Sequence, residues 1–254
     1  MIKAVVNGFL GQMGQVVSNQ IINRDDMELV GGIDRNADTY KGDIKVYKAL
    51  SDLHDDCDVI IDFSHPSSLD DLLNYAKANK SALVIGTTGY KEKEMQKLNE
   101  ASKEIPIFYS ANMSLGINLL LSLVSKTASV LGEDFDIEII EKHHNKKLDA
   151  PSGTAYMIAN KINEVFDNNK VYTFGRNAKT HKRSPKEIGI HAVRGGTIVG
   201  EHNVLFAGLD ETLEIKHSAS SKNVFAKGAL TATQFIVKKS NGLFNMDDII
   251  NQSK

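Results

Sequence analysis

The chain has 254 residues, of which 41% are hydrophobic and 24% charged, a balance that is ordinary for globular proteins and argues against intrinsic disorder. Its 30 Lys and Arg residues against 32 Asp and Glu residues give a formal net charge of −2, so charge does not indicate a nucleic-acid or membrane partner. The single cysteine, Cys57, excludes an intramolecular disulfide, and we expect a protein of the reducing cytoplasm.

Short apolar runs alternate with helical patterns from the N-terminus to about residue 110. Strands are expected at Ile2–Val6, Glu28–Asp34, Val59–Phe63, Ala82–Gly86 and Ile105–Tyr109, and helices at Met13–Asn23, Pro66–Ala78 and Lys91–Lys103. Such alternation predicts an α/β domain of the Rossmann type, with a parallel sheet and right-handed crossovers.

The pattern changes after Ser114. A long helix is expected at Leu115–Leu131, although the apolar start of this segment is judged too short and too polar to span a bilayer. Strands are expected at Phe135–Ile139, Ile188–Arg194, Thr197–Phe206 and Thr212–His217, with a two-residue hairpin turn at Gly195-Gly196. These elements predict a second, α+β substrate domain with a mixed or antiparallel sheet over residues 115–221. A helix at Lys222–Lys239 is expected to return to the first domain, which then comprises residues 1–114 and 222–254.

A glycine-rich turn follows the first expected strand and opens the first helix. Its glycines, Gly8, Gly11 and Gly14, have the spacing G-x-x-G-x-x-G. Glycine allows a sharp turn and close approach of a pyrophosphate, and the helix N-terminus supplies N–H groups. Asp34 ends the second strand, where the ribose hydroxyls of a dinucleotide should lie. This context predicts an NADH or NADPH site, and the alternative is a glycine turn without a ligand.

The cofactor preference stays open. Asp34 favours NADH because a carboxylate accepts from the 2′-hydroxyl, whereas Arg35 can pair with the 2′-phosphate of NADPH or be a solvated surface arginine. Two small polar segments follow the fourth and fifth strands, where ligands of open α/β sheets bind, although each could equally be a turn with a helix cap. The cofactor-binding candidates are Gly8, Phe9, Leu10, Gly11, Gln12, Met13, Asp34, Arg35, Gly86, Thr87, Thr88, Ser110, Ala111, Asn112 and Met113.

The most informative stretch runs from residue 141 to residue 155, where a strand leads through a polar loop into a helix. Ser152 is a plausible N-cap, and the helix start with Gly153 and Thr154 predicts a second anion site, beside which Lys147 can neutralise an acid group. His143 and His144 end the strand and would point to opposite faces if it continued, which predicts different roles. Adjacent histidines chelate one ion poorly and no acidic or cysteine cluster accompanies them, so no metal site is expected.

The segment His143-His144-x-x-Lys147-x-Asp149-Ala150-Pro151-Ser152-Gly153-Thr154-Ala155 resembles the signature of the 4-hydroxy-tetrahydrodipicolinate reductase family, also called dihydrodipicolinate reductases. Further similarities run in order along the chain: Gly8-x-x-Gly11-x-Met13-Gly14, Val84-Ile85-Gly86-Thr87-Thr88-Gly89, Ser110-Ala111-Asn112-Met113-Ser114, Arg194-x-Gly196-x-Ile198-Val199-Gly200-Glu201-His202 and Gly242-Leu243-Phe244-x-Met246. The resemblance therefore extends from the first strand to the tail.

This resemblance implies a step of diaminopimelate and lysine biosynthesis, in which NADH or NADPH delivers a hydride to C4 of a cyclic imine dicarboxylate as water is lost. It also implies a homo-oligomer, usually a tetramer. From the charge balance we expect no nucleic-acid or membrane partner. The proton that must follow the hydride makes His143 the expected general acid, with Lys147 assisting. His144, Ser152, Gly153 and Thr154 are the expected substrate-binding residues.

Two other functions compete with this interpretation. A semialdehyde dehydrogenase on a similar scaffold needs a cysteine nucleophile in the second domain, but Cys57 lies in the first. A dinucleotide-sensing regulatory protein would need the glycine turn and Asp34 but not the segment from His143 to Thr154. It would bind the dinucleotide without turning over a substrate.

Overall fold

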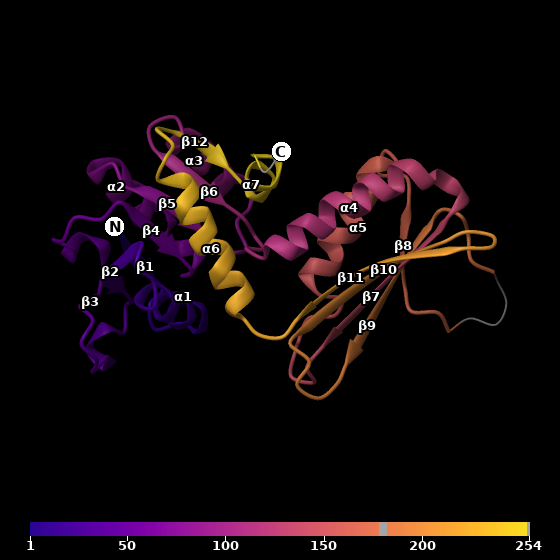
Figure 1. The fold of residues 1–254 in the computed structure, drawn as a ribbon, viewed down its shortest axis with the longest axis horizontal. Coiled ribbons are helices and arrows are strands. Elements are labelled where there is room, and N and C mark those ends of the chain that lie inside the picture. The colour runs from indigo at the N-terminus through magenta and orange to yellow at the C-terminus, as the bar shows by residue number, and fades with distance from the viewer. Residues whose placement is uncertain (178–181, 253–254) are drawn as a thin grey trace. The chain divides into compact units, whose positions relative to one another are not determined.

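The computed structural model describes residues 1–177 and 182–252, and the chain divides into two compact units (Figure 1). One unit joins Met1–Leu115 to Lys222–Lys254, and the other comprises Gly116–Ser221. The first contains a parallel sheet and the second a mixed sheet, so the predicted α/β fold class is confirmed.

The first unit is built on a seven-stranded parallel sheet in the order β12-β6-β5-β4-β1-β2-β3. Its strands are β1 (Ile2–Asn7), β2 (Met27–Ile33), β3 (Val46–Tyr47), β4 (Val59–Asp62), β5 (Ala82–Ile85), β6 (Pro106–Tyr109) and β12 (Gly242–Phe244). Its helices are α1 (Gln12–Ile22), α2 (Leu69–Asn79), α3 (Glu92–Ala101), α6 (Asn223–Ile236) and α7 (Met246–Gln252). The strand order reverses between β1 and β4, and ligands of such sheets bind beyond the carboxyl ends of the strands at that point.

Helices cover both faces of this sheet, which explains why its central strands are apolar at consecutive positions. Val6 and Ile61 belong to a core with α1 and α6, whereas Val5 and Ile60 belong to a separate core with α2 and α3. The C-terminal helix α6, yellow in Figure 1, packs beside β5 and β6. The end of the chain thus completes the unit that the beginning of the chain forms.

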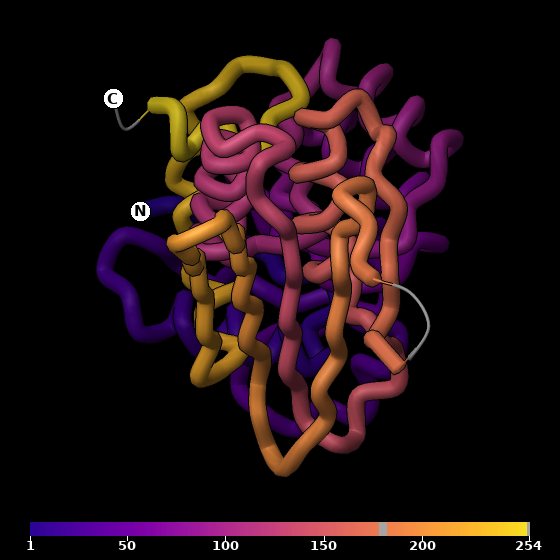
Figure 2. The backbone as a smooth tube through the Cα atoms, turned by 90° about the vertical axis from the view of Figure 1, so that its right-hand side faces the viewer, coloured from indigo at the N-terminus to yellow at the C-terminus, as the bar shows by residue number. Residues whose placement is uncertain are grey.

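The second unit is a five-stranded mixed sheet in the order β11-β10-β7-β9-β8, whose strands run side by side in Figure 2. Its strands are β7 (Asp136–His143), β8 (Val171–Phe174), β9 (Glu187–Arg194), β10 (Gly200–Ala207) and β11 (Thr212–Ala219). Its helices, α4 (Leu115–Leu131) and α5 (Gly153–Val165), pack on the inner face of the sheet in one hydrophobic core with β7, β9 and β10.

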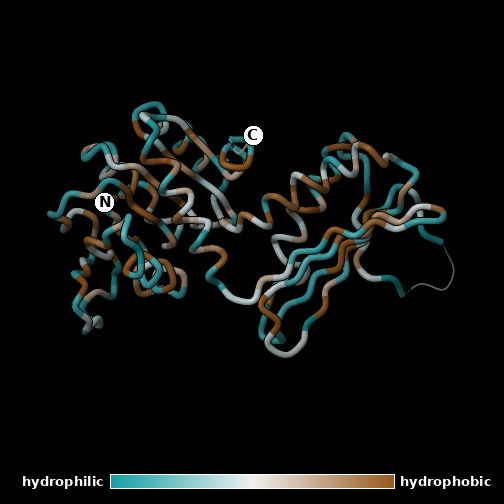
Figure 3. Tube along the Cα trace, in the orientation of Figure 1, coloured by the Kyte–Doolittle hydropathy of each residue, from teal (hydrophilic) through white to brown (hydrophobic). Residues whose placement is uncertain are grey.

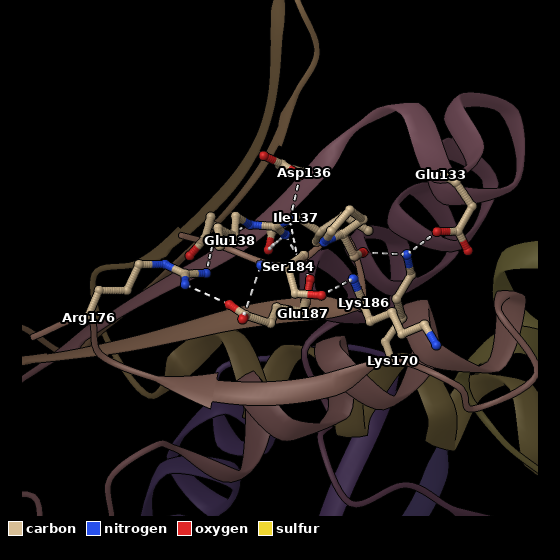
Figure 4. Close-up of polar contacts among 11 residues, drawn as sticks. Glu133, Asp136, Ile137, Glu138, Lys170, Arg176, Ser184, Lys186 and Glu187 are labelled. Carbon is tan, nitrogen blue, oxygen red and sulfur yellow. Dashed lines mark hydrogen bonds and ion pairs between the residues drawn. The ribbon is translucent and has the colours of Figure 1, made fainter. Parts of the chain in front are cut away.

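The outer face of this sheet carries ion pairs in place of a helix layer (Figure 4). The carboxylate of Glu138 contacts Arg176 at 2.5 Å, Arg183 at 3.0 Å and Nε2 of His191 at 2.6 Å. The facing position is Gly189, where a Cβ would lie 1.8 Å from Oε2 of Glu138. A glycine there is therefore what allows the carboxylate to lie over the neighbouring strand.

The predicted two-residue hairpin at Gly195-Gly196 is wrong, because β7 lies between β9 and β10. Strand β9 runs parallel to β7 and β10 runs antiparallel to it, so the connection must pass the end of β7. It is held there by a hydrogen bond from the N–H of Gly195 to the carbonyl oxygen of His143, and by one from the N–H of Asn145 to that of Gly196. The two glycines lie in a crossover connection between β9 and β10. Their composition is the same as that of a hairpin turn, so the sequence alone does not distinguish the two.

Other differences concern short or extended elements. The sequence analysis missed β3, β8, β12 and α7, each of which has seven residues or fewer. The alternation predicted a strand only over Phe135–Ile139, and β7 extends to His143, the residue at which the strand was expected to end. Buried and partly exposed positions of β7 keep alternating to its end, although Ile140 faces outward and Glu141 inward, so the strand delivers His143 to the inner face.

Helix α4 continues directly into a short 3-10 turn, Gly132–Asp134, and is largely apolar along its length (Figure 3). Among the residues that the structure describes, Leu115–Asp134 is one helix of 20 residues that is long and apolar enough to cross a membrane, and 28% of its apolar window is buried. The expectation that this segment is too short for a span is therefore wrong. A single helix of this kind is weak evidence for a span, since core helices of globular proteins also meet these criteria.

Candidate active site

The glycine-rich turn between β1 and α1 is shaped by close approach of backbone to backbone. Gly8 has a φ of +80°, and a Cβ there would lie 2.5 Å from the carbonyl oxygen of Phe63, which follows β4. A Cβ on Gly14 would lie 2.1 Å from the carbonyl oxygen of Gly8. Gly8 and Gly14 are thus required by the fold of the turn, which lies where the strand order reverses.

Several backbone donors of the turn already have partners within the protein. The N–H groups of Gly8 and Phe9 both donate to the carbonyl oxygen of Ile33, and the N–H of Leu10 donates to Oδ2 of Asp34 at 3.0 Å. These bonds hold the turn against the end of β2. Donors for an anion must therefore come from further along, at the start of α1.

The N-terminus of α1 is suited to an anion. The N-cap residue, Gly11, makes no side-chain cap, and the first turn contains no acidic residue. The first two helical residues are Gln12 and Met13, whose N–H groups have no partner within a helix. The side chain of Lys222 donates to Oε1 of Gln12, which brings a positive charge to the same place.

Phe9 and Leu10 shape the loop. The side chain of Phe9 is buried, meets the ring of Tyr40 edge-on at 5.2 Å between centroids, and covers Gly32, where a Cβ would lie 2.4 Å from the ring. Phe9 and Leu10 therefore hold the turn in position, and their contact with a cofactor stays a prediction.

Asp34 and Arg35 differ in the hydrogen bonds that their side chains make within the protein. The carboxylate of Asp34 accepts the N–H of Leu10 on one oxygen and that of Asn36 on the other, both at 3.0 Å. Each oxygen has a second lone pair and can still accept a ribose hydroxyl. Arg35 is exposed, and within residues 1–177 and 182–252 it makes no hydrogen bond or ion pair.

A buried carboxylate connects the ends of three strands. Asp62, at the end of β4, accepts hydrogen bonds from Asn7 at 2.8 Å, Ser64 at 2.5 Å and Thr87 at 2.6 Å. Burial raises the pKa of Asp62, although the three donors oppose that change. The hydroxyl of Thr87 is therefore directed into the protein, whereas its neighbour Thr88 is exposed.

The other predicted segments beyond the strand ends are also held in place. Gly86 lies against the ring of Phe63, 2.3 Å from where its Cβ would be. Ser110 donates from its hydroxyl to the carbonyl oxygen of Asn112 at 2.8 Å, and Oδ1 of Asn112 accepts the N–H of Ser114 at 2.9 Å. The remaining predicted residues of this segment are Ala111, which is exposed, and Met113, which is buried.

In the second unit, β7 brings two titratable side chains to its buried face. Ile137, Ile139, Glu141 and His143 alternate with outward-facing residues, so all four face the helices. Glu141 has no exposed surface, and its Oε2 lies 2.6 Å from Nδ1 of His143, which is 9% exposed. A carboxylate and an imidazole therefore form a pair at the end of an otherwise apolar face.

Arg194 of β9 balances this buried charge. Its two terminal nitrogens contact the two oxygens of Glu141, each at 2.7 Å, and the N–H of Ser152 donates to Oε1 at 2.9 Å. Burial by itself would raise the pKa of Glu141, but the hydrogen bonds from Arg194, His143 and Ser152 together lower it below its usual range. Glu141 is consequently an ionised group in the interior.

His202 of β10 completes the cluster. Its Nε2 lies 3.0 Å from Oγ of Ser152, and its ring meets that of His143 at 5.3 Å between centroids. Burial, together with the neighbouring His143, lowers the pKa of His202 to about 4. His202 is therefore neutral at physiological pH.

The loop after β7 carries the other predicted polar residues. His144 follows the last residue of the strand and is half-buried. Nζ of Lys147 lies 2.8 Å from Oδ1 of Asp149, a contact that holds the pKa of the Asp149 carboxyl below its usual range. Lys147 thus has an exposed carboxylate as its partner, and a bound acid group would compete for the same cation.

Among the predicted substrate residues at the start of α5, Ser152 is buried and bonded within the protein, whereas Gly153 is exposed. Ser152 is 2% exposed, and its hydroxyl accepts the N–H of Ala155 at 3.2 Å as the N-cap. Its N–H is bonded to Glu141, so Ser152 supports the helix from the inside. Gly153 and Thr154 are the first two helical residues, and no atom lies within 4 Å of a Cβ built on Gly153. Gly153, at the start of this helix, is exposed.

Sequence reasoning missed Glu141, Arg194, His202 and Lys222 as candidate site residues. For Glu141 a signal existed, because the two-residue period of Ile137 and Ile139 reaches Glu141 and then His143. Arg194 and His202 lie on other strands, and only the sheet order places them beside β7.

The described part of the chain gives little support for a metal site or for a cysteine nucleophile. Within residues 1–177 and 182–252, no group of three or more His, Cys, Asp or Glu side chains is placed to hold a metal ion. The thiol of Cys57 has its pKa raised by burial, which disfavours the thiolate that a nucleophile requires.

Both units match models of one protein family. The model described as dihydrodipicolinate reductase, N-terminus, matches residues 2–113, and the model for the C-terminus of the same enzyme matches residues 116–250. The chain belongs to the dihydrodipicolinate reductase family. Two relatives named 4-hydroxy-tetrahydrodipicolinate reductase, from Caldanaerobacter subterraneus subsp. tengcongensis and Clostridium novyi, are 51% and 45% identical to it, and each alignment covers 98% of both chains.

Solved structures agree with this membership. A dipicolinate-bound dihydrodipicolinate reductase from Paenisporosarcina sp. TG-14 matches with a TM-score of 0.82 at 26% identity, over 96% of this chain and 97% of that one. A diaminopimelate dehydrogenase from C. glutamicum matches with a TM-score of 0.59 at 14% identity, over 96% and 92%, and shares the fold alone. The predicted resemblance to dihydrodipicolinate reductases is confirmed.

Proposed function

We propose that this chain catalyses the reduction of 4-hydroxy-tetrahydrodipicolinate, a cyclic imine dicarboxylate, to tetrahydrodipicolinate with loss of water, using NADH or NADPH. This is a step of diaminopimelate and lysine biosynthesis. The observation that carries the proposal is the position of His143, paired with an ionised Glu141 at the end of β7. The same unit contains the N-terminus of α5 and the cation of Lys147, which suit an acidic substrate.

The first unit fits a nicotinamide dinucleotide. The uncapped start of α1 at Gln12 and Met13 suits a pyrophosphate, and the glycines of the preceding turn leave no room for side chains. Asp34 and the exposed Arg35 would hold the adenosine ribose. When bound, the nicotinamide supplies the hydride of the reaction.

The second unit would hold the substrate by its carboxylates. Gly153 and Thr154 present the start of α5 to one carboxylate, and Lys147 can exchange its contact with Asp149 for another. His144, half-buried beside this loop, would contact the substrate ring or its acid groups. The dipicolinate that the Paenisporosarcina enzyme binds is a planar dicarboxylate of the same kind.

His143 would supply the proton. Hydride addition at C4 of the conjugated imine leaves an enamine, whose neighbouring carbon must accept a proton. Histidine can donate a proton near neutral pH, and the ionised Glu141 stabilises the imidazolium that does so. Lys147 would assist by its charge while water is lost.

Transfer of an isotope tests this function. With NADH or NADPH deuterated at the transferable position and the freshly made condensation product of aspartate semialdehyde and pyruvate, the tetrahydrodipicolinate formed should contain deuterium from the cofactor by mass spectrometry. A product without deuterium, or no product, would contradict the proposal. Dinucleotide binding without any product would favour the regulatory alternative.

Replacing Gly153 with Ala should weaken substrate binding while leaving the fold intact. The added methyl group meets no protein atom within 4 Å but would occupy the space where a carboxylate approaches the helix. Overpacking of a well-fitted site typically costs about 1–3 kcal/mol, so the Kd of dipicolinate should rise roughly 10- to 100-fold. Calorimetric titration measures this change, with the exposed Glu164→Ala on the same helix as control. An unchanged Kd would place the anion site elsewhere.

Replacing Arg35 with Ala should weaken the binding of NADPH more than the binding of NADH. Only NADPH carries a 2′-phosphate for the exposed guanidinium to pair with, and such charge-assisted hydrogen bonds are about twice as strong as neutral ones. Fluorescence titration of both cofactors against wild type measures the ratio of the two Kd values. Equal weakening of both would show that Arg35 does not distinguish them.

The proposal also includes assembly and location. We expect the chain to form a homo-oligomer, a tetramer, in the cytoplasm. The outer face of the second sheet is the expected contact, because none of the described helices covers it and Ile140 and Val193 lie among its charged residues. Sedimentation equilibrium measures the assembly.

A further inference from the structure

We propose that Glu141 is a positioning residue that fixes the tautomer of His143, so that the ring holds and releases its catalytic proton at Nε2. Arg194, in turn, fixes Glu141. This inference deepens the proposed function and rests on it only for the catalytic consequence. The arrangement of the ring itself follows from the contacts of the cluster.

The direction of one hydrogen bond sets the tautomer of His143. An ionised carboxylate can only accept, so the ring nitrogen that faces it must donate. Oε2 of Glu141 lies 2.6 Å from Nδ1 of His143, and both side chains are on the buried face of β7 two residues apart. The neutral ring must therefore carry its hydrogen on Nδ1, and Nε2 is the nitrogen left to exchange a proton with a substrate.

Glu141 stays ionised although it has no exposed surface. A buried carboxylate is costly unless it is paired and hydrogen-bonded, and here Arg194 supplies two bonds of 2.7 Å and Ser152 a third of 2.9 Å. These donors lower the pKa of Glu141 in spite of its burial. Arg194 also donates to the carbonyl oxygen of Asp149 at 2.7 Å, which ties the pair to the loop.

The ring of His143 lies beside a glycine and an uncharged histidine. A Cβ on Gly200 would lie 3.2 Å from Nε2 of His143, so the glycine keeps that side of the ring clear of a side chain. His202 packs edge-on against His143, and its pKa of about 4 leaves it uncharged. An uncharged neighbour does not oppose an imidazolium at position 143.

One carboxylate thereby organises both halves of the substrate site. Oε2 of Glu141 bonds the proposed acid, and Oε1 accepts the N–H of Ser152, the N-cap of α5. The ring of His143 and the anion-binding start of α5 are thus held in a fixed relation by the same side chain. The oxygen of a glutamine at this position could accept from Nη2 of Arg194 and from the N–H of Ser152, but its NH₂ group would then face Nδ1 of His143 and Nη1 of Arg194.

The outer face of the same strand offers a matched control. Glu138 lies on β7 and is held by two arginines, as Glu141 is held by one, and its contact with Arg176 is drawn in Figure 4. Its carboxylate also lies 2.6 Å from Nε2 of His191. Glu138 faces away from the buried cluster. Glu138→Gln therefore makes the same chemical change in the same strand without touching His143.

The test combines long-range ¹H–¹⁵N NMR of ¹⁵N-histidine-labelled protein with steady-state kinetics. Wild type should show neutral His143 protonated on Nδ1. Glu141→Gln should shift it toward protonation on Nε2 and lower kcat by roughly 10- to 10⁴-fold, the range found when the partner that orients a functional histidine is removed or changed to an amide. The KM should change less and the Kd of NADH should not change. Glu138→Gln should alter neither the His143 signals nor kcat, and Glu141→Asp should recover part of the lost kcat.

Protonation of wild-type His143 on Nε2 would overturn the inference, as would a Glu141→Gln protein with unchanged His143 signals and kcat. If Glu141→Gln does not fold, the wild-type spectrum and Glu141→Asp still decide. The spectrum needs no turnover, so Nδ1 protonation in a protein that does not reduce the substrate would contradict the proposed function and leave the assigned tautomer standing.

Discussion

Replacing His143 with Gln should lower kcat by roughly 10²–10⁴-fold, the usual effect of losing a positioned general acid. Glutamine is the appropriate replacement because its NH₂ group can still donate to the buried Oε2 of Glu141, so the hydrogen bond that His143 makes to this carboxylate is kept. It cannot, however, deliver a proton near neutral pH. The Kd values of NADH and NADPH should stay near those of wild type, because the glycine turn and α1 belong to the other unit.

His144→Gln serves as the comparison for this prediction. His144 follows the end of β7 and has no part in the pair with Glu141, so its loss should raise KM more than it lowers kcat. Steady-state kinetics with fluorescence titration of the cofactor separates these effects. A His143→Gln enzyme with near-normal kcat, or one impaired only in cofactor binding, would show that His143 is not the acid.

Replacing Gly14 with Ala should raise the Kd values of NADH and NADPH by roughly 10- to 100-fold. This change corresponds to the cost of about 1–3 kcal/mol that is typical of overpacking. The new Cβ would lie 2.1 Å from the carbonyl oxygen of Gly8 and 2.8 Å from that of Phe9, and backbone cannot yield as a flexible side chain can. The turn and the start of α1 must then move apart. These are the groups that we expect to hold the pyrophosphate.

Gly11→Ala provides the graded control in the same turn. Its Cβ would meet one atom, the carbonyl oxygen of Gly8, at 3.1 Å, and a shift of a few tenths of an ångström relieves that contact. Its effect on NADH and NADPH affinity should be smaller than that of Gly14→Ala, and calorimetric titration of both variants measures the difference. Equal affinities for wild type and Gly14→Ala would remove the turn from the cofactor site.

The first unit was largely predictable because its signals are local. Buried parallel strands such as Val59–Asp62 are continuous apolar runs, and each is followed by a helical pattern. The glycine spacing was also readable, since Gly8 and Gly14 are required by contacts within or next to their own turn. Residue types alone could not show that the N–H groups of Phe9 and Leu10 already donate hydrogen bonds to the end of β2 and to Asp34.

The second unit was harder to predict because its sheet order is not local. Gly195-Gly196 has the composition of a hairpin turn, and only the insertion of β7 between β9 and β10 makes it a crossover. The same insertion places Arg194 and His202 on either side of β7, next to Glu141 and His143. His143 could be found from its motif, but the groups that hold its ring come from two other strands.

The most direct test of the proposed reductase function follows nicotinamide absorbance when the purified protein is mixed with NADH or NADPH and freshly made condensation product of aspartate semialdehyde and pyruvate. We predict that the cofactor is oxidised only when the condensation product is present. Dipicolinate should inhibit this oxidation in competition with the substrate, and the His143→Gln protein should lack it. A protein that binds NADH or NADPH but oxidises neither, or that loses no rate in His143→Gln, would contradict the proposed function.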